Sequence, residues 1–576
     1  MDDIRIYVAC HRESLTPRCP LFRPIQAGAG VNGRLPGLLH DDEGDNISEK
    51  NPRWCELTAL YWVWKHEDAD VIGFCHYRRY FDFSENPPEP DAYGTQRCEA
   101  LTAAAEERLG MDEASIRRAI AGKSLLVANP TPLRTLGAAD LFEQYAAAPE
   151  LRREDLLCAI GVLEEKYPEY REAAARYLHG DRFYPCNLFV MEKSLFRVYC
   201  AWLFDVLEET ERRLDWTDRS VESLRTMGHI AERLLGVFYT RQQQLGRAVG
   251  VLPWSLMRCT EPFVPPEPAF PGEGVPIVLC FNAYFAPYAA AALRSLAAHF
   301  SPERRYDLLV LHTDIGPVDR KLMALSLGER ENISLRFVNL LPLVADLCWK
   351  AHGHITVETY FRLQIPWLLK SYDKALYLDC DLLALRDVAE LYDTPLDGLL
   401  LAAAADPDHA GQYGGVLPAQ KAYTDGVLQL EKPYDYFQAG VLLLNLAEFR
   451  RSFGENELTE LAQAREYMYM DQDLLNACCQ GRVKLISQRW NLLMDFGGIR
   501  MNEVIRRGAP KRIYDEYRQA RRDPWIVHYA GCDKPWDEPG CDYGALFWAY
   551  ARETPYYELM LRRMACRAEP PPKPLL

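Results

Sequence analysis

A proline-rich segment near the middle of the chain divides it into two parts. Residues 253–276 contain seven prolines in 24 positions, and proline fixes φ and removes a backbone hydrogen-bond donor. We expect this segment to be neither helix nor inner strand, and to act as a semi-rigid linker. At 576 residues the chain is also too long for one hydrophobic core. The predicted domains are residues 1–250 and 276–555, joined by a linker over 251–275 and followed by a helix end and proline-rich tail over 556–576.

The composition is that of a soluble globular protein, with 48% hydrophobic and 26% charged residues. The formal net charge of -16 argues against nucleic-acid binding, because DNA affinity comes mostly from Lys and Arg on phosphates. The 17 cysteines are odd in number and contain no CxxC pair, so we expect reduced thiols in a cytosol. No stretch approaches the roughly 18 apolar residues that span a bilayer, and the acidic start is unlike a signal peptide.

Each part of the chain begins with a short apolar strand, IRIYVAC at 4–10 and VPIVLCF at 275–281. Helical and strand-like segments alternate after each of them, which predicts α/β folds with mostly parallel sheets. Residues 55–81 and 359–385 also share one order of helix, turn and strand, ending in HYRR and in DCD respectively. Ligands of open α/β sheets bind beyond the carboxyl ends of strands. The chain is therefore predicted to hold two sites built on one plan.

Two aspartates, Asp379 and Asp381, follow the apolar strand KALYL. Residues i and i+2 of a strand point to the same face, so both carboxylates can converge on one cation. Oxygen ligands suit Mg²⁺ or Mn²⁺, which in turn bind diphosphates. The bare pattern is a weak signal, because the chain repeats it at three other places and most such pairs are solvated turn residues.

A second apolar strand further along the chain strengthens the metal hypothesis. The stretch WIVHYAGCDKPW places His528 after that strand, followed by Gly531 and Lys534. The imidazole could be a metal ligand, the glycine lets backbone approach a phosphate, and the lysine can neutralise phosphate charge. The alternative is a capped strand with an incidental turn, because a lone histidine is more often structural.

Six stretches of the second part, in order, resemble glycosyltransferase family 8, a retaining group that includes bacterial lipopolysaccharide galactosyl- and glucosyltransferases. They are VPIVLCFNAYFAPYAAAALRSL, ITVETYFRLQIPWLL, KALYLDCDLLAL, YFQAGVLLLNLAEFR, YMDQDLLN and VHYAGCDKPW. The resemblance covers about residues 275–555. It implies a GT-A (Rossmann-like) nucleotide-diphospho-sugar transferase fold, a UDP-sugar as donor, and Mn²⁺ or Mg²⁺ as cofactor. It also implies that the metal ligands are Asp379, Asp381 and His528.

The same resemblance implies the residues that contact the donor. Gly531 and Lys534 would contact the diphosphate, Arg362 would lie near the donor, and Asp471 would contact the donor sugar. Gln472 matches the position on the sugar's β-face where a nucleophile has been sought. Because an amide is a poor nucleophile, we expect front-face attack with retention rather than a covalent intermediate.

Two positions of the donor site depart from the family pattern. Gln438 stands where many members have asparagine, and Asn282 and Ala283 stand where members often show an acidic pair. The side-chain oxygen of Asn282 can still accept a hydrogen bond from the uracil N3–H. We therefore expect both Gln438 and Asn282 to contact the donor.

The stretches DNISEKNPRWCELTALYWVWKH and DADVIGFCHYRRYF in the first part resemble the bacterial domain family of unknown function numbered 4422. The resemblance covers about residues 3–250. That family recurs in polysaccharide biosynthesis loci, and some members are linked to galactofuranosyl transfer. It implies that the N-terminal α/β part is a second glycosyltransferase domain, also GT-A-like.

The residues of the first part suggest a site without a cation. His76, Arg78 and Arg79 stand where the second part has its carboxylates, and arginines present bidentate donors suited to phosphate. Glu56, on the preceding helix, is a candidate base or arginine partner. The alternative is that both arginines are surface charges and that Glu56 only forms a salt bridge.

Together these features predict a two-domain, bifunctional bacterial glycosyltransferase that transfers hexoses from UDP-sugars to a growing cell-surface glycan. The C-terminal half would be metal-dependent and retaining. Two alternatives remain open: a single active C-terminal half whose N-terminal domain binds acceptor or serves as scaffold, and a non-catalytic protein that binds glycan or nucleotide sugar. A lipid-linked glycan acceptor is expected by analogy, which predicts a cytoplasmic protein with peripheral contact at the inner membrane face.

Overall fold

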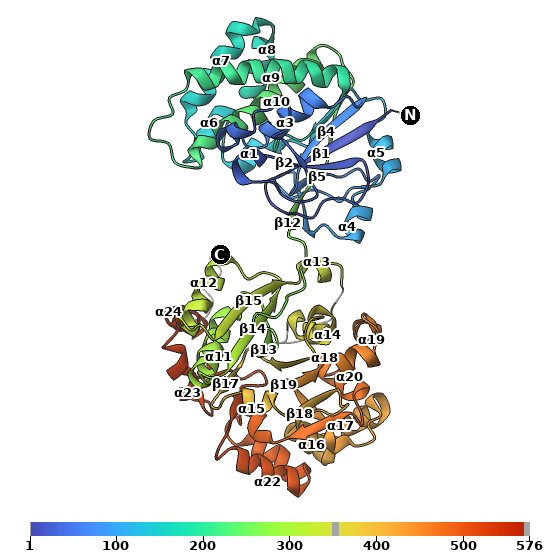
Figure 1. Cartoon of the computed structure of the whole chain (residues 1–576), viewed down its shortest axis with the longest axis vertical. Helices are drawn as coiled ribbons and strands as arrows, with labels where there is room; N and C mark the ends of the chain where they lie inside the picture. Colours follow the sequence, from blue (N-terminus) through green and yellow to red (C-terminus); the bar gives the residue numbers. More distant parts are fainter. Residues whose placement is uncertain (1, 348, 350–355, 569–576) are drawn as a thin grey trace, which may run out of the picture. The chain divides into compact units, whose positions relative to one another are not determined.

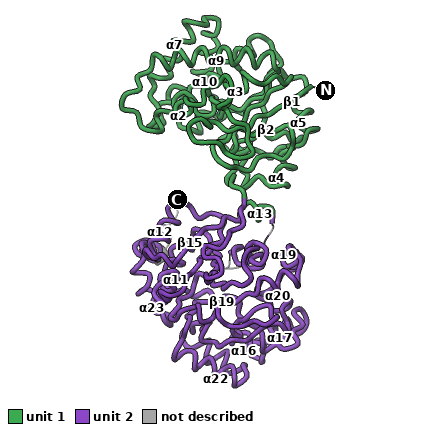
Figure 2. Tube along the Cα trace, in the orientation of Figure 1, with its two compact units in different colours: residues 1–262, 342–346 green, residues 263–341, 347–576 purple. Residues whose placement is uncertain are grey.

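A computed structural model describes residues 2–347, 349 and 356–568 of the chain (Figure 1). The predicted tail over 569–576 lies outside the described residues. Two compact units make up the chain, as Figure 2 shows in two colours. Unit 1 comprises residues 1–262 and 342–346, and unit 2 comprises residues 263–341 and 347–576.

Seven of the ten strands in the sheet of unit 1 follow the order β11-β7-β10-β4-β1-β2-β3. Parallel pairing joins β1 to β2 and to β4, whereas β10 runs antiparallel to both β4 and β7. The strands are β1 (Ile4–Cys10), β2 (Phe22–Gln26), β3 (Leu39–His40), β4 (Val71–His76), β7 (Leu125–Ala128), β10 (Phe189–Glu192) and β11 (Val249–Leu252).

Long helices with aromatic faces cover the sheet of unit 1. Helix α9 (Lys193–Arg213) packs on β4 and β10, and α3 (Leu57–His66) packs on α9. The rings of Trp54 and Trp64 both stack on Phe204 of α9. The tryptophans before and within α3 are thus core residues, which fixes the position of the loop that enters α3.

Unit 2 has a seven-stranded sheet in the order β15-β14-β13-β16-β19-β18-β20. Its first four strands pair in parallel, β19 runs antiparallel to β16 and to β18, and β20 is parallel to β18. The strands are β13 (Gly274–Cys280), β14 (Arg305–His312), β15 (Ile333–Asn339), β16 (Lys374–Leu378), β18 (Leu401–Ala405), β19 (Phe437–Asn445) and β20 (Val483–Ile486). The two sheets share strand order, direction and sequence of connection, which confirms the predicted α/β class in both halves.

The strand β4 in unit 1 and the strand β16 in unit 2 occupy the same place in this plan. Each lies between a parallel neighbour and the one reversed strand, and each leads through a tight turn into a short strand. These short strands are β5 (Arg79–Phe81) and β17 (Leu382–Ala384). Strand β16 is buried and has a neighbouring strand on each side. Polar side chains can therefore be accommodated only where this strand ends.

One prediction about the linker is wrong. Residues Trp254–Cys259 form β12, which pairs antiparallel with β5 and parallel with β6 (Gln96–Ala100). The prolines of this segment stand at Pro253 and from Pro262 onward, so the eight residues between them, six of which form β12, keep every backbone N–H. The prediction was based on the proline content of the whole segment. It therefore missed a short proline-free stretch that can form a strand.

No described helix combines the length and the apolar character that crossing a bilayer requires.

Candidate active site

A cavity of about 760 Å³ opens in unit 2 beyond the carboxyl ends of β13 and β16. Nine of the ten side chains predicted for this half line it: Arg362, Asp379, Asp381, Gln438, Asp471, Gln472, His528, Gly531 and Lys534. Ligands of open α/β sheets bind at this end of the strands. The structure therefore brings residues that are up to 172 positions apart in the chain, from 362 to 534, to one cavity.

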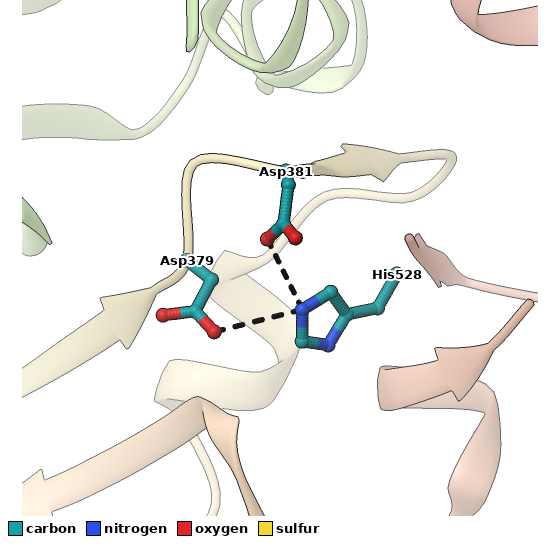
Figure 3. Close-up of side chains that lie close together, drawn as sticks. All are labelled: Asp379, Asp381 and His528. Atoms are coloured by element: carbon teal, nitrogen blue, oxygen red, sulfur yellow. Dashed lines mark hydrogen bonds and ion pairs between the residues drawn. The ribbon is translucent and has the colours of Figure 1, made fainter. Parts of the chain in front are cut away.

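Asp379, Asp381 and His528 point toward one another at the entrance of β17 (Figure 3). The Nε2 atom of His528 lies 3.5 Å from Asp379 Oδ2 and 3.2 Å from Asp381 Oδ1. His528 ends β22 (Ile526–His528), and the antiparallel pairing of β22 with β17 sets it opposite Leu382. Backbone pairing thus places the imidazole beside the turn that carries both carboxylates.

The spacing of these three side chains fits a divalent cation. Octahedral ligands held at about 2.1 to 2.3 Å from an ion lie about 3.0 to 3.3 Å from one another, close to the two separations observed here. Two carboxylate oxygens and one imidazole nitrogen suit Mn²⁺ or Mg²⁺. The predicted ligand set is compatible with such an ion.

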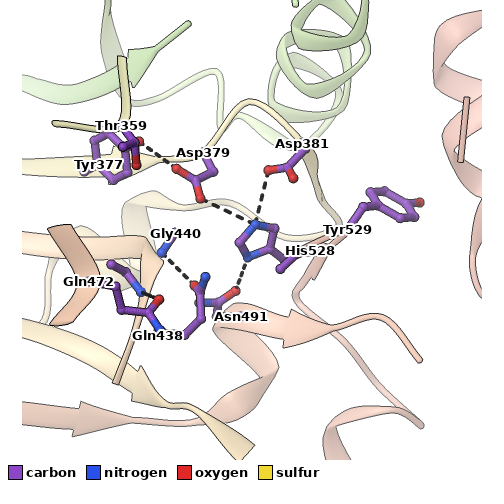
Figure 4. Close-up of polar contacts among 12 residues, drawn as sticks. Thr359, Tyr377, Asp379, Asp381, Gln438, Gly440, Gln472, Asn491, His528 and Tyr529 are labelled. Carbon is purple, nitrogen blue, oxygen red and sulfur yellow. Dashed lines mark hydrogen bonds and ion pairs between the residues drawn. The ribbon is translucent and has the colours of Figure 1, made fainter. Parts of the chain in front are cut away.

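An amide behind His528 fixes which ring nitrogen faces the carboxylates (Figure 4). Asn491 donates from Nδ2 to Gln438 Oε1 at 2.6 Å, so its Oδ1 is the acceptor of the 2.8 Å bond with His528 Nδ1. The proton therefore sits on Nδ1, and the lone pair of Nε2 faces Asp379 and Asp381. Gln438, predicted to contact the donor, supports this histidine from behind. Asn491 carries no sequence signal and was missed.

Gly440 makes room for the side chains of Asp379 and His528. A Cβ added there would lie 2.2 Å from a ring carbon of His528 and 2.6 Å from Asp379 Oδ2. The backbone N–H of Asp379 also donates to the Gly440 carbonyl at 2.8 Å. Only glycine permits this close approach. It was overlooked because it lies inside an apolar strand rather than in a turn.

Arg362 is buried behind the carboxylates and joins two of them. Its Nη2 lies 3.1 Å from Asp379 Oδ1, its Nε lies 2.9 Å from Asp471 Oδ2, and its guanidinium stacks 4.4 Å from the Tyr377 ring centroid. Burial alone would lower the pKa of Arg362, but Asp379 and Asp471 hold this pKa above its ordinary value. Arg362 therefore keeps its charge and fixes the orientation of Asp379.

Lys534 lies on Asp381 rather than free in the cavity. Its Nζ donates to Asp381 Oδ2 at 2.5 Å and to the Tyr529 carbonyl at 2.8 Å. Burial would raise the pKa of Asp381, yet the charge of Lys534, with His528, holds it well below its usual range. The carboxylate thus stays ionised, and its second oxygen remains turned toward His528.

Gln472 is held from both ends of its amide. Oε1 accepts from the Ala439 N–H at 2.9 Å, while Nε2 donates to Asp406 Oδ2 and to the Tyr436 hydroxyl, both at 3.2 Å. Burial, with Asp408 nearby, raises the pKa of Asp406 to about 6. The amide therefore has one fixed orientation in the cavity wall.

The D-x-D pairs at 406/408 and 471/473 are not solvated turns, contrary to the general expectation for such pairs. Asp406, Asp408 and Asp471 line the cavity, and Asp473 is fully buried against the hydroxyls of Tyr423 and Tyr436. Burial raises the pKa of Asp471 to about 6, and the charge of Arg362 limits that rise. Sequence spacing alone could not separate these buried pairs from exposed ones.

Asn282 is the one predicted residue of this half that is absent from the cavity lining. Its Oδ1 accepts from the N–H groups of Tyr284 and Phe285, and its Nδ2 donates to Glu358 Oε2 at 3.3 Å. The side chain therefore fastens the loop after β13 to the buried Glu358. Phe281, Tyr284 and Phe285 line the cavity at this point instead.

The predicted residues of unit 1 gather at the end of β4. His76 ends that strand, Arg79 begins β5, and Glu56 stands at the start of α3. Burial, followed by the charge of Arg79, lowers the pKa of His76 to about 3, so this imidazole is neutral. Arg78 is exposed and Arg79 half-buried. The surface-charge alternative thus describes Arg78 better than Arg79.

The fold of unit 2, with two carboxylates and an imidazole converging in its cavity, is compatible with a glycosyltransferase. Residues 276–540 match glycosyl transferase family 8, and residues 5–243 match a domain of unknown function, DUF4422. Both predicted resemblances are confirmed, each in the half of the chain for which it was predicted. Family 8 enzymes take nucleotide sugars and typically use a divalent metal.

Known proteins are similar to part of the chain or to nearly all of it. General stress protein A of Bacillus subtilis is 26% identical over 274 residues, 45% of this chain and 87% of that protein. The lipopolysaccharide 1,2-glucosyltransferase of Escherichia coli is 24% identical over 220 residues, 37% of this chain and 56% of that enzyme. The apo structure of the bifunctional glycosyltransferase WbbM aligns over 98% of this chain and 100% of its own, with 29% identity and a TM-score of 0.54.

Proposed function

We propose that unit 2 transfers a hexose from a UDP-sugar, with a divalent cation held by Asp379, Asp381 and His528, and with retention of configuration. The observation that carries this proposal is the convergence of those three side chains, with Lys534 beside them, on the main cavity of a family 8 domain. A cation bound there would offset the negative charge that develops on the departing diphosphate.

The protein groups around the donor would act by holding charge and position. Lys534 neutralises phosphate charge, and Arg362 keeps Asp379 turned toward the ligand site. Gly531 has φ of +113°, a conformation that favours glycine, and it lines the cavity where backbone can approach a phosphate. Asp471, ion-paired to Arg362, is placed to accept from sugar hydroxyls.

The fixed amide of Gln472 favours front-face attack with retention. An attacking oxygen would need to leave the hydrogen bond that Ala439 N–H donates to Gln472 Oε1. A fixed amide is compatible with a residue that only borders the sugar. A nucleophile would instead have to move toward the anomeric carbon. We therefore assign Gln472 to positioning of the sugar.

We further propose that unit 1 is a second transferase, which makes the chain bifunctional. Its sheet repeats the plan of unit 2, and the overall likeness to WbbM covers both units. At the end of β4, His76, Arg78 and Arg79 replace the carboxylates. Among the described residues, the group spaced to hold a metal lies in unit 2, so we expect the diphosphate in unit 1 to be held by arginines alone.

The acceptor that fits this pair of activities is a growing cell-surface glycan, carried on a lipid. Such an acceptor would bring the protein to the cytoplasmic face of the inner membrane through peripheral contact. The alternative for unit 1 is acceptor binding without catalysis, because sites of that kind also use arginines and aromatic side chains.

UDP release from UDP-galactose and UDP-glucose, with Mn²⁺ and with EDTA, tests the activity of unit 2. We expect Asp381→Ala to lower release by about 10³-fold, and EDTA to do the same to the wild type. Asp393→Ala, which removes an exposed carboxylate paired with Arg304, is the matched control and should have no effect. Metal-dependent release that survives Asp381→Ala would overturn the assignment.

A further inference from the structure

We propose that Glu56, held in place by Asn187, is the catalytic base of a second active site at the end of β4. The inference rests on the proposed second activity of unit 1 and identifies its reacting centre. Glu56 is the first residue before α3, and Asn187 comes from the distant loop before β10 (Phe189–Glu192). The two side chains meet where the sheet plan sets the metal site of unit 2.

Strained backbone marks this place. Cys55, Cys186 and Asn187 have φ of 50°, 75° and 48°, a left-handed conformation that residues with a Cβ rarely adopt. Such a conformation is unfavourable and persists where the surrounding structure imposes it, most often at functional sites. Here two separate loops pay this cost at adjacent positions, and the residues that they present are Glu56 and Asn187.

Asn187 orients the Glu56 carboxylate directly. The Nδ2 of Asn187, which is 1% exposed, donates to Glu56 Oε1 at 2.8 Å. Among the described residues, Glu56 forms no ion pair with an arginine or lysine, while Arg79 senses its charge at longer range. A carboxylate held by one neutral amide remains free to accept a proton.

The opposite side of the loop is fastened independently of Glu56. The N–H of Cys186 donates to Glu232 Oε1 at 3.1 Å, and Arg233 holds the other oxygen of Glu232 at 3.0 Å. Arg233 is itself buried, at 2% exposure. The Glu232–Arg233 ion pair therefore anchors the strained loop. The side-chain amide of Asn187 is not needed for this and can bind the Glu56 carboxylate.

Two buried polar atoms at this place have no partner in the protein. They are Nδ1 of His76 and Oδ1 of Asn187, neither of which has a hydrogen bond among the described residues. An unpartnered polar atom in a buried position is costly and indicates a ligand group that completes it. Because His76 is neutral, it can donate to or accept from a sugar hydroxyl.

The strand register puts this centre at the place that corresponds to Asp379 and Gly440 in unit 2. Phe189 of β10 pairs with Phe74 of β4, so Asn187 lies beside the end of β4 at His76. In unit 2 the corresponding contact joins Asp379 to Gly440. On this correspondence of the two sheets, we assign to Arg79 the role proposed for the cation in unit 2, and to Glu56 the removal of the acceptor's proton.

The reaction step then balances as a single displacement. The acceptor hydroxyl gives its proton to the Glu56 carboxylate while its oxygen forms a bond to the anomeric carbon of the sugar. The bond from that carbon to the β-phosphate oxygen breaks, and its electron pair stays on the departing diphosphate, whose negative charge the half-buried Arg79 offsets. One base and no covalent intermediate predict inversion in unit 1, in contrast to retention in unit 2.

The test uses the full chain carrying Asp381→Ala, in EDTA, with a panel of UDP-sugars that includes UDP-galactofuranose and a lipid-linked glycan acceptor. Glu56→Gln keeps an oxygen for Asn187 but cannot take a proton, so we expect kcat to fall by at least about 100-fold with little change in the donor KM. Glu165→Gln, a surface carboxylate paired with Arg213 in the same unit, should leave turnover unchanged.

Asn187 is a positioning residue, and a pH profile separates that role from a structural one. Asn187→Asp sets a second carboxylate beside Glu56, so the acid limb of the kcat profile should move up by about one pH unit or more. The other titratable groups that face Glu56 are Cys55, Arg79, Cys186, Tyr199 and His229. Asn187→Ala should lower kcat by about 10- to 100-fold without that shift.

The possible results distinguish the two levels of the proposal. Chelator-resistant turnover that survives Glu56→Gln would overturn the role of Glu56 while leaving the second activity intact. If the Asp381→Ala parent shows no turnover in EDTA, the second activity is overturned. The proposed role of Glu56 as its base is then overturned as well. An unshifted acid limb in Asn187→Asp would remove Asn187 from the mechanism.

Discussion

His528 and Asn491 share a hydrogen bond of 2.8 Å that selects the tautomer of the imidazole. With the proton on Nδ1, the Nε2 lone pair is directed at the carboxylates. Groups in this position typically change metal affinity by 10- to 100-fold when removed. We expect Asn491→Ala to weaken Mn²⁺ binding by that factor, measured by electron paramagnetic resonance of free Mn²⁺ in a titration.

Asn332→Ala is the control for this variant. Asn332 also uses its amide within the fold, donating to the carbonyls of Ser301 and Arg304 away from the cavity. It should leave Mn²⁺ affinity unchanged. Equal affinities in Asn491→Ala and wild type would show that His528 needs no fixed tautomer.

Gly440→Ala tests whether the site depends on close backbone approach. The added methyl group would overlap the His528 ring and the Asp379 carboxylate, so both must move. A displacement of about 1 Å at a reacting centre can cost about 100-fold in rate, and we expect at least that loss in UDP release. Gly426→Ala meets open space and should behave as wild type, whereas an active Gly440→Ala enzyme would contradict the described geometry.

Arg362→Met should destabilise unit 2, because it leaves Asp379 and Asp471 without their shared cation. Breaking a buried ion pair by removing one partner costs about 3 to 5 kcal/mol. We expect the thermal transition that responds to Mn²⁺ to fall by on the order of 10 °C. Arg386→Met removes an exposed pair with Glu390 and should move that transition little. Similar shifts for both variants would mean that the Arg362 network adds no stability.

The raised pKa values of Asp406 and Asp471, both about 6, predict the pH dependence of unit 2. As the pH falls through 6 these carboxylates take protons, the pairing of Asp471 with Arg362 and of Asp406 with Gln472 weakens, and transfer should decline. Their effect on stability has the opposite sign, because the folded state binds these protons more tightly than the unfolded chain.

A rate profile from pH 5 to 8, with a parallel series of urea unfolding curves, checks both signs. The stability contribution of these two groups is largest below about pH 4 and is lost as the pH rises through 6. Asp406→Asn should make the decline in rate below pH 6 smaller than in the wild type. A rate that stays flat down to pH 5 would show that neither carboxylate must be ionised.

The sequence predicted those parts of the site that follow from strand ends. Asp379, Asp381 and His528 stand directly after apolar runs, so their convergence followed from sheet geometry. The supporting residues could not be predicted in this way. Asn491 lies before a two-residue strand with no motif, and Gly440 is unremarkable until the positions of its neighbours are known.

The fold of unit 1 was predictable in outline for the same reason. The alternation of helices and strands indicated its α/β class, and HYRR indicated a site at the end of β4. The role of Asn187 was hidden, because it depends on a left-handed backbone and on register with a strand over 100 residues earlier. Trp254–Cys259 was obscured by the prolines that flank it.

The most direct test of the account is UDP release by the wild-type chain in EDTA, measured across a panel of UDP-sugars with a lipid-linked glycan acceptor. The account predicts at least one donor whose turnover is abolished by EDTA and restored by Mn²⁺, and another whose turnover persists. Loss of turnover on every donor, or persistence on every donor, would contradict two active sites of which one holds a metal and the other does not.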